Sequence, residues 1–232
     1  IKSLIFDFGG TIDTDGIHWS EKFWECYQKF NIPINKKQYE EAYRKGEPNV
    51  EQALSVNDIF KKTLDTQIYF QFKFLFDNKL LDKKEYQNLI PKITDNCYNY
   101  VKEKTFNVKS LLKQLSDNYS MALVSNFYGN INAVLSEFEI NNFFDSVIDS
   151  SEVEISKPNP KIFLLALNEL KTAPESSVVI GDSYLRDIQP AKLLGCTTIW
   201  LDGKSWSRPT NTKSADYIIN SIYDIKKLLL NN

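Results

Sequence analysis

LIFDFGGTID, residues 4–13, is the stretch that decides the fold of this 232-residue chain. Three apolar residues run into Asp7, and Gly9 and Gly10 follow it. The apolar run predicts a buried strand that ends at Asp7, and the glycines allow a sharp turn close to a small ligand. An acid in such a place is often only a turn former. In open α/β sheets, however, ligands bind at the carboxyl ends of strands, so the position of Asp7 indicates a functional site.

The composition places the chain among globular proteins. Apolar residues make up 42% of the sequence, enough for one large α/β domain or for a core domain that carries a smaller one. The net charge is −2, from 28 basic and 30 acidic residues without a long block of one sign. We therefore expect neither nucleic acid nor a membrane surface as a partner.

Cysteine use and targeting patterns favour a cytoplasmic location. Cys26, Cys97 and Cys196 lie far apart without CxxC spacing, which is typical of reduced thiols packed in a core. The sequence has no run of about 18 apolar residues, and its first residues lack the layout of a signal peptide. It does not begin with Met, so what precedes Ile1 is left open, as is the choice between a monomer and a homodimer.

Residues 15–104 are predicted to be helical. Aromatic side chains recur at helical spacing from Trp19 to Phe30, for example. The expected helices cover residues 19–30, 36–45, roughly 49–64 and 82–100. Residues 66–76 fit both a helix and a strand, and their helical neighbours favour a helix. Pro91 must kink or shorten the last of these helices.

From Thr105 onward the pattern alternates between strands and helices, which is typical of a parallel sheet covered by helices. The expected strands are residues 121–124, 146–148, 178–180, 197–201 and 217–219. The helices expected between and after them are residues 108–115, 131–138, 162–170, 188–194 and 222–230. We therefore expect a discontinuous α/β core, residues 1–14 and 105–232, interrupted by a helical insert of residues 15–104.

Polar side chains follow three of the predicted strands. Asp7 and Asp182 end two of them, and Ser125 with Asn126 ends a third. A pair of carboxylates with waters is the usual way in which a protein holds Mg²⁺. Lys157 lies in a loop stiffened by two prolines, and its ammonium group suits a phosphoryl oxygen. These residue types together indicate a site for a phosphate and a metal ion.

Each of these residues also has a purely structural explanation. Ser125 and Asp182 can be helix N-caps, and Lys157 can be a solvated loop lysine. Asp187 lies five residues after Asp182, where it can hold Lys157 or a metal-bound water, or simply favour the helix dipole. Their order at successive strand ends is what favours a site.

Four segments resemble, in order, the motifs of the haloacid dehalogenase superfamily. They are DFGGT at residues 7–11, LVSN at 123–126, KP at 157–158 and GDSYLRD at 181–187. The resemblance covers essentially the whole chain, because the helical insert matches the cap of one subclass. It implies a Rossmann-like core with a helical cap, a Mg²⁺ ion, and an aspartate that forms a covalent intermediate before hydrolysis.

The resemblance also implies a role for each matching residue. Asp7 would be the nucleophile, and the metal would be held by Asp7, Asp182 and the Gly9 carbonyl. Asp187 would support the residues that hold the metal and the phosphate. Lys157 and Ser125 would assist catalysis. The residues expected to bind the phosphoryl group are Thr11, Ser125, Asn126 and Lys157.

Gly9 departs from the pattern of the family's phosphatases. In the family, these phosphatases share a second aspartate two residues after the nucleophile. This second aspartate protonates the leaving alcohol and then activates water. Such acid–base help is worth about 10²–10⁴-fold in rate. We therefore expect a substrate with a good leaving group or a surrogate acid, for which His18 and Asp15 are the nearby candidates.

Two other classes of function stay open at this point. Phosphonatases and 2-haloacid dehalogenases are similar to this chain in lacking that aspartate. The dehalogenases need no metal and lack the acid found here at Asp182, whereas phosphonatases need a lysine from the cap and have arginine where Lys157 stands. A binding or regulatory protein with little turnover is the third reading. The main prediction is a Mg²⁺-dependent phosphatase that acts on a small phosphorylated metabolite.

Substrate choice would lie with the helical insert. Arg44 and Lys45 stand beside Gly46, where they can meet a second anionic group of the substrate or simply favour a helix C-terminus. The aromatic residues of the insert are expected to form its own core. The loop of residues 202–206 follows a core strand and is expected to border the same crevice.

Overall fold

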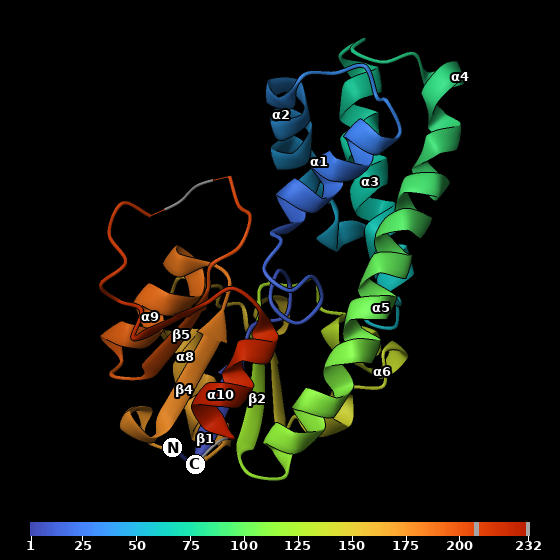
Figure 1. Ribbon diagram of the computed structural model, residues 1–232. Coiled ribbons are helices and arrows are strands. Elements are labelled where there is room, and N and C mark those ends of the chain that lie inside the picture. The colour runs from blue at the N-terminus through green and yellow to red at the C-terminus, as the bar shows by residue number, and fades with distance from the viewer. Residues whose placement is uncertain (207–208, 231–232) are drawn as a thin grey trace.

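Six parallel strands form the sheet of this protein, whose computed structural model describes residues 1–206 and 209–230 (Figure 1). The strands lie in the order β3-β2-β1-β4-β5-β6. Their bounds are β1 (Ser3–Phe6), β2 (Ser120–Ser125), β3 (Ser146–Asp149), β4 (Ser177–Gly181), β5 (Thr197–Leu201) and β6 (Tyr217–Ile219). All pairings are parallel, so the predicted α/β class with a Rossmann-like sheet is confirmed.

Helices connect the strands and surround the sheet. They are α1 (Trp19–Lys29), α2 (Lys36–Gly46), α3 (Phe60–Asp77), α4 (Lys83–Tyr86), α5 (Ile90–Ser116), α6 (Ile131–Glu137), α7 (Ser150–Val153), α8 (Lys161–Glu169), α9 (Gln189–Leu193) and α10 (Ile225–Leu229). A single π-helical turn, Tyr184–Ile188, precedes α9. Within the described ranges, no helix combines the length and the apolar character needed to cross a bilayer.

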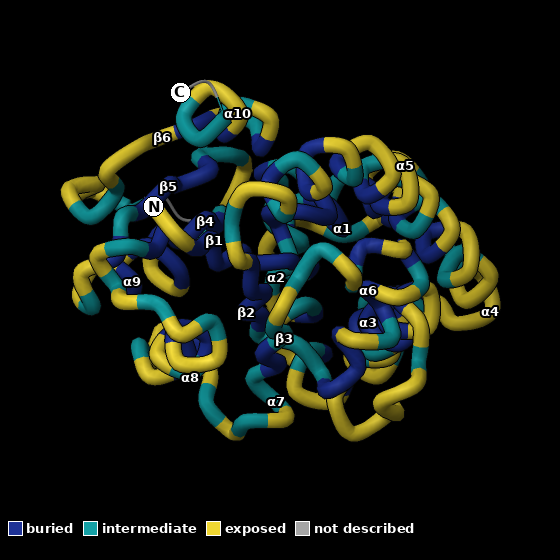
Figure 2. The backbone as a smooth tube through the Cα atoms, turned by 90° about the horizontal axis from the view of Figure 1, so that it is seen from below, coloured by how far each residue is buried: buried dark blue, intermediate teal, exposed yellow. Residues whose placement is uncertain are grey.

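The two faces of the sheet are buried against different helices. Along β1, Leu4 and Phe6 belong to the apolar cluster that includes residues of α5, α6 and α10. Ile5 points to the opposite face and packs in a cluster with α8 and α9. This alternation follows from the two-residue period of a strand. Figure 2 shows β1, β2 and β4 as a buried centre between the helices.

The helices that follow β1 form a separate layer of aromatic packing. Tyr27 of α1 lies against Tyr39 of α2 and Phe72 of α3, with ring centroids 5.0 and 5.4 Å apart. The helix favoured for residues 66–76 is confirmed within α3. The helix predicted over 49–64 is wrong in its first half, because two 3₁₀ turns, Glu47–Asn49 and Glu51–Ala53, occupy that stretch. Asp58 Oδ2 accepts from the Ser55 N–H at 2.8 Å, which closes a turn between these 3₁₀ turns and α3.

Helix α5 joins the helical layer to the sheet (Figure 1). Asp82 caps the short α4 by accepting a hydrogen bond from the Glu85 N–H at 3.1 Å, and Pro91 lies in the first turn of the new helix α5. The expected shortening at Pro91 is therefore confirmed. The separate helices predicted before and after Thr105 are one helix of 27 residues. The predicted boundary at residue 105 thus has no break in the backbone to mark it.

The three cysteines are buried and form no disulfide, as their spacing predicted. The Sγ atoms of Cys26 and Cys97 lie 3.3 Å apart, between α1 and α5. Cys196 packs in the cluster on the opposite face of the sheet. The role in packing expected for all three agrees with these positions.

Candidate active site

The order of the strands brings Asp7 and Asp182 together. Chain order runs from β1 to β2 and β3 on one side, then returns to β4 on the other side of β1. Such a reversal leaves a crevice at the carboxyl ends of the two adjacent strands. Asp7 follows β1 and its N–H donates to the Ile180 carbonyl of β4 at 2.9 Å, while Asp182 follows β4 directly.

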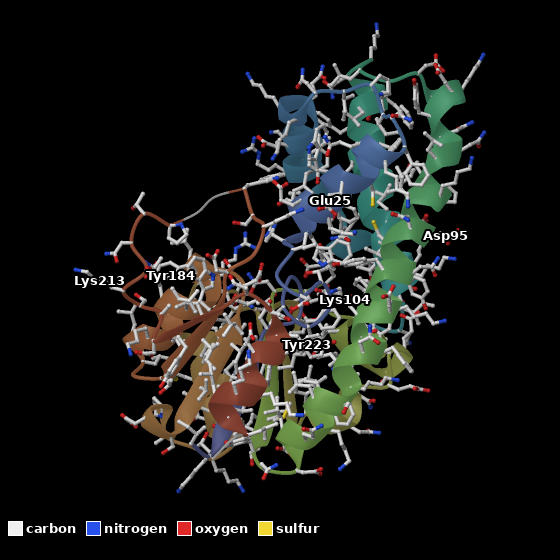
Figure 3. All side chains as sticks on the ribbon, viewed as in Figure 1. Glu25, Asp95, Lys104, Tyr184, Lys213 and Tyr223 are labelled. Atoms are coloured by element: carbon white, nitrogen blue, oxygen red, sulfur yellow. The ribbon has the colours of Figure 1, made fainter. Side chains whose placement is uncertain are left out.

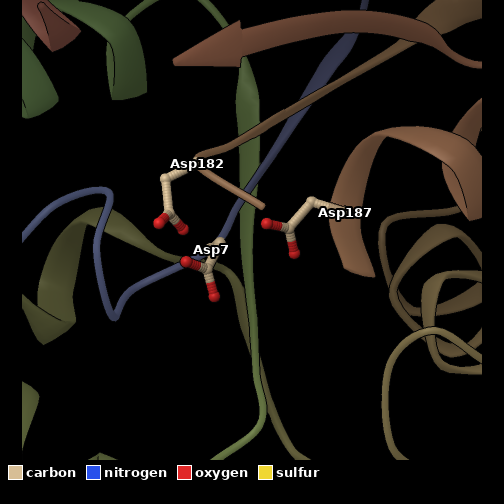
Figure 4. A group of neighbouring side chains, drawn as sticks. All are labelled: Asp7, Asp182 and Asp187. Atoms are coloured by element: carbon tan, nitrogen blue, oxygen red, sulfur yellow. The ribbon is translucent and has the colours of Figure 1, made fainter. Parts of the chain in front are cut away.

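Three carboxylates converge at this crevice (Figure 4). Asp7, Asp182 and Asp187 each offer an oxygen atom, and these atoms lie within 4.8 Å of one another. Burial and the charges of Asp7 and Asp187 raise the pKa of Asp182 well above its ordinary value. Burial likewise raises the pKa of Asp187 to about 6. A divalent cation would relieve this repulsion, and oxygen donors of this kind fit Mg²⁺.

Lys157 neutralises part of this negative charge. Its Nζ donates to Asp7 Oδ1 at 2.5 Å, to Asp187 Oδ1 at 2.7 Å and to the Val124 carbonyl at 3.1 Å. These contacts use all three protons of the ammonium group. Burial alone would lower the pKa of this amine, but the two carboxylates outweigh it and raise the pKa above its ordinary value. The lysine is therefore part of the site and not a solvated loop residue.

Thr11 holds the other carboxylate oxygen of Asp7. Its hydroxyl donates to Asp7 Oδ2 at 3.0 Å and accepts from the Asp182 N–H at 3.0 Å. Because a hydroxyl has one proton, none is left for a phosphoryl oxygen. The predicted phosphate contact is thus replaced by a positioning role that ties the end of β1 to the end of β4.

Glycine is required where the carboxylates approach the backbone most closely. Gly10 has a positive φ of 98°, and a Cβ there would lie 2.4 Å from Asp182 Oδ2. A Cβ on Gly181 would lie 2.4 Å from Asp187 Oδ2. Any side chain at either position would displace an acid of the site.

Asn126 lines the cavity and is also bonded to the loop that carries Lys157. Its amide donates to the Lys157 carbonyl at 3.0 Å, and its Oδ1 accepts from the Lys157 N–H at 2.8 Å. This reciprocal pair fixes the loop that carries Lys157, so the amide positions the lysine. Ser125, at the end of β2, is buried and lines the cavity beside Asp7, as the sequence predicted.

Asp13 is a site residue that the sequence analysis did not identify. Its Oδ1 accepts from the Gly10 N–H and its Oδ2 from the Trp19 Nε1–H, both at 2.7 Å. Burial raises the pKa of this carboxyl to about 7. The acid joins the turn after Asp7 to the first helix of the insert. An acid inside a glycine-rich, apolar turn was the sequence pattern that could have identified it.

A small cavity of about 60 Å³ opens above Asp7. It accommodates only a few atoms, since one water occupies about 30 Å³ in the liquid. Its lining unites most of the predicted site residues with two that were not predicted, Ser183 and Arg186. The lining residues are Asp7, Gly9, His18, Ser125, Asn126, Lys157, Asp182, Ser183, Arg186 and Asp187.

Of the two acids considered as surrogates, His18 lines this cavity. Its Nδ1 accepts from the Ser20 N–H at 3.2 Å and so caps α1, which places the proton of the neutral ring on Nε2. Burial and the charge of Arg186 lower the pKa of His18, so the ring is mainly neutral at neutral pH. It is therefore available as a hydrogen-bond donor at the cavity.

Asp15, the other candidate acid, is held elsewhere. Its carboxylate accepts from the Ile222 N–H at 2.8 Å, from the Ser221 hydroxyl at 3.1 Å and from Lys104 Nζ at 3.3 Å. These partners belong to the start of the 3₁₀ turn Ile222–Asp224, which follows β6, and to α5. The proximity of Asp15 to Asp7 in sequence therefore does not bring it into the cavity.

A larger cavity of about 400 Å³ adjoins the small one. The two share His18, Asp182, Ser183 and Arg186 in their linings. Arg44 lines the larger cavity, as predicted for a substrate contact. Lys45 is exposed and is absent from the linings of both cavities, so the predicted pair of cations is divided.

A hydrogen-bonded cluster between the helical insert and the core borders the site from another side. The Tyr128 hydroxyl donates to Glu47 Oε1 and accepts from Gln67 Nε2, the latter at 2.7 Å. Burial raises the pKa of Glu47. Glu47 and Tyr128 line a further opening together with Asn126 and Arg186. Sequence patterns gave no signal for this cluster, because its members come from three separate elements.

Comparisons with known proteins agree with this geometry. Residues 4–201 match the family model described as haloacid dehalogenase-like hydrolase. The glyceraldehyde 3-phosphate phosphatase of Pyrococcus furiosus is 29% identical over 136 residues, which cover 57% of this chain and 56% of that enzyme. The chain thus spans about half the length of this curated relative.

Two solved structures share the fold over nearly the whole chain. One is the magnesium-bound structure of YfnB from Bacillus subtilis, with 17% identity, 98% of both chains covered and a TM-score of 0.60. The other is a dehalogenase with an intermediate complex, with 16% identity, 100% and 98% covered and a TM-score of 0.64. Identities this low show a shared fold only. The reaction has to be inferred from the residues of the site.

Proposed function

Because this chain belongs to the haloacid dehalogenase-like hydrolase family, we propose that it is a Mg²⁺-dependent phosphatase of a small phosphorylated metabolite. The phosphatase named among its relatives supports this choice. The main observation that supports the proposal is the way in which the Asp7 carboxylate is held. Both of its carboxylate oxygens are held, one by Lys157 and one by Thr11, at the mouth of a cavity that accommodates only a few atoms.

The reaction takes place in two displacements at phosphorus. An oxygen of Asp7 attacks the phosphorus, the bond from phosphorus to the leaving oxygen breaks, and the electron pair departs with that oxygen. Water then attacks the same phosphorus, which releases inorganic phosphate and restores the Asp7 carboxylate. Lys157 offsets the repulsion between the carboxylate and the anionic phosphate, and the Ser125 hydroxyl is placed to contact a phosphoryl oxygen.

Asp7, Asp182 and the Gly9 carbonyl are the groups that would hold Mg²⁺. A bound Mg²⁺ supplies positive charge beside the transferring phosphoryl group. Asp187, which accepts from Lys157 and from the Ser183 N–H at 3.0 Å, keeps the lysine and the end of β4 in place. The presence of Asp182 beside Asp7 speaks against a metal-free dehalogenase reaction.

The helical insert, residues 15–104, serves as the cap of this enzyme in our proposal. Tyr43 and Arg44, at the end of α2, line the cavity beside the site, and Glu47 lines another opening. Residues 1–14 and 105–232 form the core, although α5 runs through the boundary. A cap excludes water during transfer and readmits it for hydrolysis.

Removal of the metal is expected to abolish turnover. With Mg²⁺ present, p-nitrophenyl phosphate and acetyl phosphate should be hydrolysed, because their leaving groups need little protonation. Excess EDTA should lower phosphate release by at least about 10²-fold, and added Mg²⁺ should restore it. Equal rates with and without EDTA would contradict the proposal, and metal-free release of fluoride from fluoroacetate would favour a dehalogenase instead.

A carboxylate restored at position 9 is expected to extend the substrate range. A Cβ on Gly9 would lie 3.6 Å from Trp19 Cδ1, which is ordinary contact, so the backbone at position 9 tolerates the Cβ that Gly9→Asp introduces. A general acid contributes about 10²–10⁴-fold, and we expect a gain near the lower end for a simple alkyl phosphate such as glycerol phosphate. Acetyl phosphate should gain less than about threefold, since its leaving group needs no proton.

The matched controls for this gain are Gly9→Asn and His18→Asn. Gly9→Asn has nearly the same shape without an acid and should not raise alkyl phosphate turnover. His18→Asn should reduce activity more in the parent protein than in the Gly9→Asp variant, where the new acid substitutes for the imidazole donor. Equal gains from Asp and Asn at position 9 would show that the gain does not come from protonation of the leaving group by residue 9.

A further inference from the structure

The larger cavity beside the site has the dimensions of a small-molecule site. Its volume of about 400 Å³ lies within the range of about 300–1,000 Å³ typical of ligand pockets. The small cavity above Asp7 holds about 60 Å³ and accommodates a phosphoryl group but not the rest of a metabolite. The small cavity shares four lining residues with the larger cavity and only Asn126 and Arg186 with the opening beside Glu47, so the larger cavity is the better place for the body of a substrate held at Asp7.

Aromatic rings form much of the wall of this larger cavity. Tyr184 and Trp200 meet edge to face on the core side, with ring centroids 5.3 Å apart. Tyr43 of α2 and Trp206 meet in the same manner on the opposite side, at 5.2 Å. All four rings line the cavity, and Figure 3 places Tyr184 beside the loop that follows β5. Walls of this kind bind flat rings by stacking and edge contacts.

The loop that carries Trp206 is fixed to the segment that carries His18. Lys204 pairs with Ile17 as a parallel bridge, in which the His18 N–H donates to the Lys204 carbonyl at 2.9 Å and the Lys204 N–H to the Gly16 carbonyl at 2.8 Å. The Trp206 Nε1–H is buried and has no acceptor among residues 1–206 and 209–230. Because this N–H is closed off from solvent, it does not face the cavity, and Trp206 lines the cavity with the apolar part of its ring.

Four residues shared by the two cavities mark where the bond from phosphorus to the leaving oxygen would break. Among them, His18 presents a neutral ring with its proton on Nε2, and Arg186 presents a guanidinium group. No carboxylate in the described part of the chain forms an ion pair with Arg186. These two groups can stabilise a departing anion by hydrogen bonding and charge, without giving up a proton.

We infer that the substrate is an aryl phosphate, the phosphate ester of a phenol-like hydroxyl, with its ring in the larger cavity; this inference rests on the proposed phosphatase function. A phenol has a pKa near 10, like that of tyrosine, so it leaves as the anion far more readily than an alcohol. The absence of an acid at Gly9 and the aromatic walls therefore favour the same class. Asp7 attacks phosphorus, the bond to the aryl oxygen breaks, and the phenolate departs with the electron pair and takes its proton from water.

Two esters with equally acidic leaving hydroxyls separate ring recognition from leaving-group chemistry. Naphthyl phosphate carries a flat ring, and hexafluoroisopropyl phosphate carries a fluorinated alkyl group whose alcohol is as acidic as a naphthol. Burial of the ring should give the naphthyl ester a kcat/KM about 10–100-fold higher, as measured in direct competition. An equal kcat/KM for the two esters would overturn the inference.

Two exposed leucines provide a matched pair of variants. Leu185 is 56% exposed and lines the larger cavity, whereas Leu193 is 82% exposed on the neighbouring helix α9 and lies outside that lining. Leu185→Glu should lower the naphthyl to fluoroalkyl ratio about 10-fold, because it places a charge against the ring. Leu193→Glu should leave the ratio unchanged, and equal shifts in the two variants would overturn the inference.

Acetyl phosphate separates failure of the aryl phosphate inference from failure of the proposed phosphatase function. If acetyl phosphate is hydrolysed through Asp7 but naphthyl phosphate is no better than the fluoroalkyl ester, the inference fails and the proposed function stands. If neither acetyl phosphate nor either of the two esters is hydrolysed with Mg²⁺ present, both fail. Hydrolysis of acetyl phosphate together with the preference for the naphthyl ester supports both.

Discussion

Asp7→Asn is expected to lower kcat for acetyl phosphate by at least about 10⁴-fold, the scale on which loss of a catalytic nucleophile acts. The amide has nearly the same shape as the carboxylate, and its oxygen can still accept from the Thr11 hydroxyl, which now lies 3.0 Å from Asp7 Oδ2. It cannot form an acyl phosphate at a useful rate, because a neutral amide oxygen is a poor nucleophile. Initial rates of phosphate release at saturating Mg²⁺ measure the loss.

The control for this variant is Asp95→Asn. Asp95 is an exposed residue of α5 (Figure 3) in an ion pair with Lys61 at 2.7 Å, far from the sheet edge that carries Asp7. Its replacement should leave kcat within about twofold, because exposed ion pairs contribute little. Residual activity of Asp7→Asn within about 10-fold of the parent would contradict the assignment of Asp7 as the nucleophile.

Lys157→Met is expected to affect both stability and activity. The variant leaves the buried carboxylates of Asp7 and Asp187 without their cation, and breaking a buried ion pair in this way costs about 3–5 kcal/mol of unfolding free energy. The rate of phosphate release should fall by at least about 10²-fold, since the charge that offsets the incoming phosphate is lost. Urea denaturation in the presence of EDTA measures the first effect, and initial rates measure the second.

Two further variants test the cause of this loss. Lys192→Met removes an exposed lysine, paired with Asp216 at 2.6 Å, and should cost no more than about 1 kcal/mol. The double variant Lys157→Met/Asp187→Asn removes one of the stranded charges and should recover part of the stability, but not the activity. A loss below about 1 kcal/mol for Lys157→Met would mean that the buried carboxylates do not depend on this lysine.

The strand ends of the site were predictable from local sequence patterns. Asp7, Ser125 and Asp182 each follow a short apolar run, and alternation of strands and helices after residue 105 predicts that such ends share one edge of a sheet. The structure places all three in the lining of one cavity. Local patterns were sufficient here because the information lies within a few residues of each strand.

Hydrogen-bond partners were less predictable, because they come from distant parts of the chain. Thr11 and Asn126 have groups that suit a phosphate, yet the Thr11 proton is used by Asp7 and one of the two Asn126 amide protons by the Lys157 loop. Asp15 lies close to Asp7 in sequence, but its carboxylate meets Ser221, 206 positions away. A side chain with the right chemistry therefore predicts a role only after its nearest partners are known.

The extent of α5 was readable in the sequence but was missed. Residues 92–116 contain neither Gly nor Pro, so nothing in the backbone ends a helix there. The boundary at residue 105 was inferred from a change in the hydrophobic pattern. That change arises because one helix packs against α3 with its first half and against the sheet with its second half. A change of packing partner does not interrupt the helical backbone.

The larger cavity beside the site is the part that sequence patterns predicted least. Trp206 lies in the loop after β5, Tyr43 in the last turn of α2 and Arg186 in the π-helical turn, and only the tertiary fold brings them together. The loop of residues 202–206 was expected to border the crevice, and Ser205 and Trp206 do line the larger cavity.

Whether Asp7 carries the phosphoryl group is tested most directly by acid quenching of the enzyme during turnover of acetyl phosphate with Mg²⁺, followed by peptide mass spectrometry. We expect the peptide that contains Asp7 to gain the mass of one phosphoryl group at that residue, and the gain to disappear in Asp7→Asn. Phosphate release at full rate with Asp7 unmodified, or with the phosphoryl group on another residue, would contradict an aspartyl-phosphate reaction at Asp7.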